Sequence, residues 1–67
     1  MGMSSPKTKA EARERIAKLQ GNIAREKAFM AHQKAVIKGY NPMHERGRIA
    51  DWKAEIAELR AKIPSLP

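Results

Sequence analysis

The sequence predicts an all-α protein: an antiparallel two-helix hairpin with coiled-coil-like packing, which we expect to self-associate into a helical bundle. Three observations lead to this fold class. Apolar residues recur at helical spacing in two separate segments, a turn signal at residues 39–42 lies between them, and the two apolar stripes match when the chain folds back at that turn. With 67 residues, the chain is expected to form one domain.

The first helix is expected over residues 8–38, after a polar lead-in at 1–7 that we expect to be disordered. Thr8 and Glu11 are spaced as a capping box, in which a hydroxyl and a carboxylate satisfy backbone N–H groups at a helix start. Gly21 costs about 1 kcal/mol relative to alanine inside a helix, so a turn at this point is the alternative. The apolar positions keep their phase through it, which favours an unbroken helix with a stripe of Ala12, Ile16, Leu19, Ile23, Met30 and Ile37.

The turn is expected at 39–41 and the second helix at 42–63. Gly39 suits a left-handed conformation after a helix, and Asn41 is expected to cap the second helix with Pro42 at its first position. Pro64 ends this helix and leaves a tail at 64–67, because the residue before a proline is pushed away from helical geometry. The second apolar seam, at alternating steps of three and four, consists of Ile49, Trp52, Ile56, Leu59 and Ile63.

The register of the hairpin follows from the position of the turn. Residues that face each other should have numbers that sum to about 79, which pairs Met30 with Ile49, Ile23 with Ile56 and Ile16 with Ile63. Trp52 is then expected to be buried opposite residues 26–30, with its indole N–H bonded to the Glu26 carboxylate. The predicted hairpin core is Ile16, Leu19, Ile23, Met30, Ile49, Trp52, Ile56, Leu59 and Ile63.

Charge points to an anionic partner, and the basic residues gather near the turn. The chain has 14 Lys+Arg against 7 Asp+Glu, a formal net charge of +7, which favours binding to a polyanion. Tyr40 could stack on a nucleic-acid base beside these cations. The alternative is a charged loop that only keeps the protein in solution. The candidate anion-binding residues at the hairpin tip are Lys34, Lys38, Tyr40, Arg46 and Arg48.

Other features favour contacts with protein. A domain of this size is only marginally stable alone. The first helix is the longer one, so we expect Thr8 to Arg15 to overhang the end of the second helix. Alanines beside the apolar stripes would let another helix approach closely, although they could equally reflect high helix propensity. The candidate partner-interface residues are Ala24, Phe29, Ala31, Val36, Ala54 and Ala57.

Catalysis is not expected, because no nucleophile stands beside a base and an orienting group. The absence of cysteine and the presence of only two histidines predict no metal site and no cofactor. No apolar run approaches the roughly 20 residues of a membrane span, and we expect a cytoplasmic protein. We therefore expect a non-catalytic interaction or assembly protein (an adaptor, inhibitor or structural subunit) that forms homo-oligomers or binds a larger protein. The alternative is nucleic-acid or nucleotide binding through the basic tip.

Overall fold

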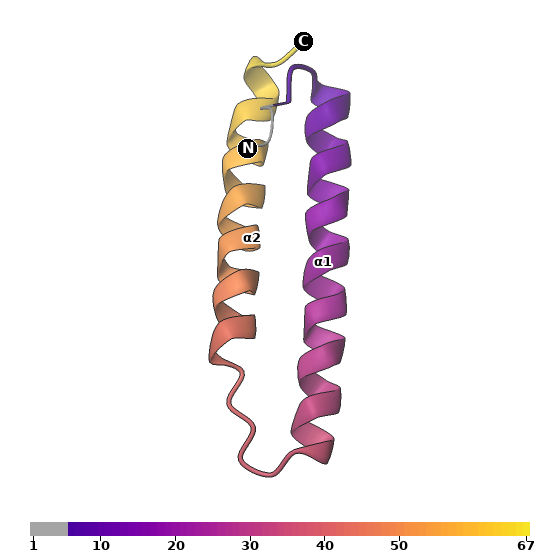
Figure 1. The fold of residues 1–67 in the computed structure, drawn as a ribbon. Coiled ribbons are helices and arrows are strands. Elements are labelled where there is room, and N and C mark those ends of the chain that lie inside the picture. Colours follow the sequence, from indigo (N-terminus) through magenta and orange to yellow (C-terminus); the bar gives the residue numbers. More distant parts are fainter. Residues whose placement is uncertain (1–5) are drawn as a thin grey trace.

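The computed structural model describes residues 6–67, so most of the predicted lead-in lies outside the described residues. Two long helices, α1 (Lys9–Val36) and α2 (Met43–Lys62), are followed by a short 3₁₀ turn, η1 (Ile63–Ser65). They pack side by side as a hairpin 49 Å long, with both described ends of the chain at the same end of the molecule (Figure 1). The predicted all-α helical hairpin is confirmed.

The start of α1 is held by its cap. The Thr8 hydroxyl accepts a hydrogen bond from the backbone N–H of Glu11 at 3.1 Å. The Glu11 carboxylate accepts from the N–H of Lys7 at 2.8 Å, one residue before the position that a standard capping box uses. From there α1 continues through Gly21 without a break to Val36.

The turn has the left-handed Gly39 that was predicted, but the start of α2 differs from the prediction. The N–H of Tyr40 donates to the carbonyl of Ile37, and Gly39 between them has a φ of 76°, which a side chain would disfavour. The predicted cap by Asn41 is wrong. The carbonyl of Pro42 accepts the first helical bond, from Arg46, so Pro42 itself is the N-cap and no side chain caps α2.

The core lies in the half of the hairpin farther from the turn. Ile23, Trp52 and Ile63 are partly buried against it. Ala12 is also fully buried, Ile49 is buried outside the cluster, and Met30 is only half-buried. Ile37, the last member of the predicted stripe, is 46% exposed because it follows the end of α1. The buried cluster itself consists of Ile16, Leu19, Ile56 and Leu59.

The register is displaced by about one helical turn from the predicted one. Three contacts between the two arms join residues whose numbers sum to less than 79: Glu26 with Arg48, Arg15 with Glu55, and Lys9 with Pro67. The predicted overhang of Thr8 to Arg15 is also wrong, because the N–H of Lys9 donates to the carbonyl of Pro67 at the end of the chain. The connection at 37–42 instead runs back along α1, so the end of α1 extends past the start of α2 (Figure 1).

Candidate interaction surfaces

A groove lies between the helices near the turn, and we call it the tip groove. Its volume is about 280 Å³, and Met30, Ala31, Tyr40 and Pro42 form its apolar part. Three cations complete the lining and no acidic residue contributes to it; they are Lys27, Lys34 and Arg46. Lys34 and Arg46 were predicted as anion-binding residues, and the structure brings them together here. Lys38 lies outside the groove, exposed in the turn.

Tyr40 has an internal role. Its hydroxyl donates a hydrogen bond to the carboxylate of Glu45, which is only 8% exposed. The residue is half-buried and lines the tip groove, so the hydrogen bond to Glu45 fixes the ring instead of leaving it free to stack on a base. Glu45 is not among the residues predicted from the sequence, although a signal is present: it stands four residues before Ile49, on the seam of α2.

Arg48 and Glu26 form an ion pair across the two helices. The Nε and Nη2 atoms of Arg48 donate to the two carboxylate oxygens of Glu26, at 2.8 and 3.1 Å. This hydrogen bonding by Arg48 lowers the pKa of Glu26, and the same contact raises the pKa of Arg48. The hydrogen bonds to Glu26 among the described residues come from Arg48, and the predicted one from the Trp52 indole is not formed. Trp52 is half-buried and lies beside Asn22 and Arg25.

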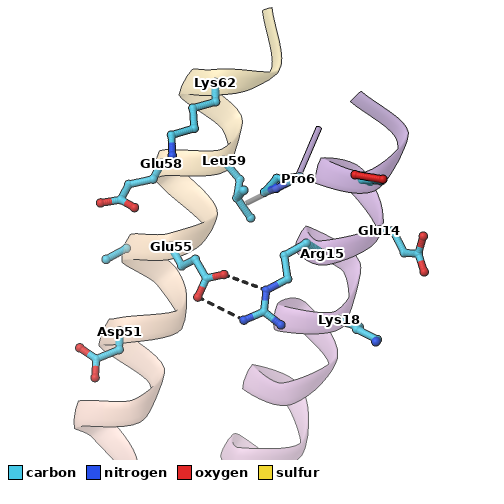
Figure 2. A pocket seen from close by; sticks show the side chains of 11 residues that line it. Pro6, Glu14, Arg15, Lys18, Asp51, Glu55, Glu58, Leu59 and Lys62 are labelled. Carbon is cyan, nitrogen blue, oxygen red and sulfur yellow. Dashed lines mark hydrogen bonds and ion pairs between the residues drawn. The ribbon is translucent and has the colours of Figure 1, made fainter. Parts of the chain in front are cut away.

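A second and larger groove runs between the helices toward the open end of the hairpin (Figure 2), and we call it the acidic groove. Its volume is about 660 Å³. Arg15 crosses it and donates to both carboxylate oxygens of Glu55, at 2.8 and 3.3 Å. Lys18 and Lys62 also line this groove, and its five acids are Glu11, Glu14, Asp51, Glu55 and Glu58.

The two grooves open on opposite sides of the hairpin. At 100° per residue, Lys27 lies about 180° around α1 from Lys18, which lines the acidic groove. Two rows of cations continue the side of the tip groove; their members are seven residues apart, except that Gln20 occupies the position between Arg13 and Lys27. The cations on α1 are separated from Lys27 by multiples of seven residues, and those on α2 are separated from Arg46 in the same way. We call this surface the basic face; its six exposed members are Arg13, Lys27, Lys34, Arg46, Lys53 and Arg60.

Acidic side chains avoid the basic face. Five of the seven line the acidic groove, and Glu26 lies beside Trp52, on the same side as that groove. Glu45 is buried at the seam. Within residues 6–67, neither of the two ion pairs involves a member of the basic face. The formal charge of +7 is therefore unevenly distributed over the surface.

Large apolar side chains are exposed on the acidic-groove side near the tip. Phe29 and Val36 are seven residues apart on α1, and they are 46% and 61% exposed. Phe29 lies beside Trp52, so these three residues form what we call the apolar patch. The predicted interface alanines are all exposed but do not form one surface: Ala54 lines the acidic groove, Ala31 lines the tip groove, and Ala24 and Ala57 lie on the side of the basic face.

The described residues contain no group of three or more side chains placed to hold a metal ion. No helix among them is long and apolar enough to cross a bilayer. No family model, curated protein or solved structure matches this chain. Fold and surfaces together define a small all-α hairpin with a face of six exposed cations on one side and most of its acidic side chains, mixed with other cations, on the opposite side.

Proposed function

We propose that the protein is a non-catalytic interaction and assembly protein that acts through protein–protein contacts, as an adaptor, inhibitor or structural subunit. One observation carries this proposal: the apolar patch exposes Phe29 and Val36 beside the half-buried Trp52, on a hairpin with a very small core. A chain this short gains stability by covering such surface with a partner. The absence of cysteine suits the reducing cytoplasm, where we place the protein.

The partner that we propose for the apolar patch is a second copy of the chain. A patch on one side of the hairpin can pair with itself about a twofold axis, as most soluble homo-oligomers do. Phe29 and Val36 lie one heptad apart on α1, so two copies of α1 can pack in the manner of a helical bundle. The cations of the basic face then remain outside the contact, on the opposite side of each copy.

Sedimentation tests the proposal directly. At tens of micromolar the native protein should form a dimer, and its melting temperature should rise with concentration by mass action. Phe29→Gln/Val36→Gln should be monomeric. Met43→Gln is the matched control, because Met43 is 64% exposed but lies outside the apolar patch; it should remain dimeric. A native monomer at every concentration, or a patch variant that still dimerises, would refute the proposal.

The alternative of nucleic-acid binding at the hairpin tip loses two of its five candidate residues. Tyr40 bonds to Glu45, and Arg48 to Glu26. Lys34, Lys38 and Arg46 remain exposed and take part in neither ion pair of the described chain. The tip by itself therefore supports the alternative less well than the sequence suggested.

A further inference from the structure

We propose that the basic face binds the phosphate backbone of a nucleic-acid duplex without reading its sequence. The proposal does not rest on self-association, because the basic face and the apolar patch lie on opposite sides of the hairpin. It differs from binding at the tip because its cations extend along both helices. Only Lys34 and Arg46 belong to both candidate surfaces.

The first argument is the uniform sign of the charge. Six exposed cations occupy the basic face, and the seven acids lie on the other side or at the seam. An ordinary solvated helix surface mixes both signs, so that each cation has an acidic neighbour. A surface of one sign without such neighbours attracts a polyanion and releases its condensed counterions, which is the main source of sequence-independent affinity for nucleic acid.

The second argument is the spacing of the cations. Seven residues of helix advance about 10.5 Å, so the row from Arg13 to Lys34 extends about 32 Å. One turn of a DNA duplex is about 34–36 Å long. The second row, from Arg46 to Arg60, lies on a helix packed about 8–10 Å from the first. The major groove is about 12 Å wide. A hairpin that lies along the duplex axis crosses the phosphate strands, and its two rows can contact phosphates on both sides of a groove.

The third argument concerns the other polyanions. A helix that lies in a membrane surface buries a large apolar face beside its cations, but the exposed side chains of Phe29 and Val36 lie on the side opposite the basic face. Binding of single strands uses exposed aromatic rings as stacking surfaces. Tyr40, the aromatic residue that lines the tip groove, is held by Glu45. The basic face therefore fits a duplex backbone better than a bilayer or a single strand.

The test is fluorescence anisotropy with a labelled DNA duplex of about two helical turns (~20 bp) and an RNA duplex of the same sequence. The logarithm of the affinity should fall with the logarithm of the salt concentration by about 0.9 per phosphate contact, giving a slope near −5 if all six cations bind. Lys27→Gln/Lys53→Gln removes two contacts, so its slope should be shallower by about 2.

Lys18→Gln/Lys62→Gln is the matched control. It removes the same charge by the same substitution, but both lysines line the acidic groove. Its slope and affinity should stay close to those of the native protein. All four lysines are exposed, so circular dichroism should show unchanged helicity in both variants.

Three results would overturn the proposal. The native protein could fail to bind either duplex at about 50 mM salt. The control could lose as much affinity as the basic-face variant, which would mean that net charge alone is responsible. Finally, binding could be stronger to vesicles rich in phosphatidylserine, or to a single strand, than to either duplex.

Discussion

Leu19→Ala measures how much of the stability of the hairpin depends on its small buried cluster. Leu19 is fully buried (0% exposed) and packs in the cluster with Ile56 and Leu59. Truncation of such a leucine to alanine costs about 2.7–5.0 kcal/mol, and less where the surroundings can close on the cavity. Two helices joined by one connection can move together, so we expect a cost near the lower end, about 3 kcal/mol.

That loss is large for this protein. At about 0.05–0.15 kcal/mol per residue, a chain of this length has a free energy of unfolding of roughly 3–10 kcal/mol. A melting temperature falls by about 4–8 °C per kcal/mol in small domains, so Leu19→Ala should melt roughly 12–24 °C lower than the native protein. Urea unfolding followed by far-ultraviolet circular dichroism gives the free energy independently of the melting curve.

Leu66→Ala is the matched control, because Leu66 is only half-buried, after η1 and outside the cluster. It should cost about 1 kcal/mol or less. The two variants lose the same atoms, so the difference between them reports mainly the burial of Leu19, because the helix propensities of leucine and alanine are close. Equal losses in the two variants would show that the cluster around Leu19 is not the centre of stability.

Three further predictions follow from individual contacts. Arg48 lowers the pKa of Glu26, so the stabilisation from this pair should be present above the ordinary pKa of 4.5 and be lost as the pH falls through the lower pKa of the folded state. When the free energy of unfolding is measured as a function of pH in the acid range, Arg48→Gln should lack this loss. Trp52 is half-buried, so Trp52→Ala should lower the free energy of unfolding by less than the loss of about 3–5 kcal/mol that is typical of a fully buried aromatic residue. For the same reason, iodide should partly quench the fluorescence of Trp52 in the native protein. Gly21→Ala should raise the free energy of unfolding by about 1 kcal/mol, since the added carbon meets only Arg25 Nη1 at 3.6 Å. Gly39→Ala should lower the free energy of unfolding, because Gly39 has a positive φ. If the denaturant midpoints of the two variants shifted in the same direction, this reasoning would be contradicted.

Local features of the fold were predictable because they depend on neighbouring residues. Apolar spacing specifies two helices whatever their partner, and the hydroxyl of Thr8 caps α1 through an atom three residues away. The continuity of α1 through Gly21 follows from the unbroken phase of Ile16, Leu19 and Ile23. None of these predictions requires knowledge of how the two helices meet.

The register was not predictable in the same way. Isoleucines and leucines recur along both seams, so a slide of one turn replaces one apolar pair by another of similar size. The conformation of the connection then decides between registers, and it depends on contacts absent from the apolar pattern, such as the bond from Tyr40 to Glu45. Because the register is displaced, the C-terminal end of α1 extends beyond α2. The sequence had predicted that the N-terminal end of α1 would extend beyond it.

The candidate surfaces show the same division. Composition shows the excess of cations. To predict that the cations are separated from the acids, one must also know which way each side chain points around its helix and which sides of the two helices are in contact. Heptad spacing of Lys27 with Lys34, and of Arg46 with Lys53, was visible in the sequence. This spacing produces one basic surface only if the two rows lie on the same side of the hairpin. The tip groove shows that they do, because Lys27 and Lys34 of α1 and Arg46 of α2 all line it.

This separation makes the two proposed contacts compatible. A dimer that covers Phe29 and Val36 places the acidic-groove sides of the two copies toward each other and both basic faces outward. If cations were spread over both sides, the same contact would bury like charges, and their repulsion would oppose association. Because acids accompany the cations Arg15 and Lys18 on the inner side, the charges there largely balance. Most of the excess positive charge therefore remains on the surface that a polyanion can reach.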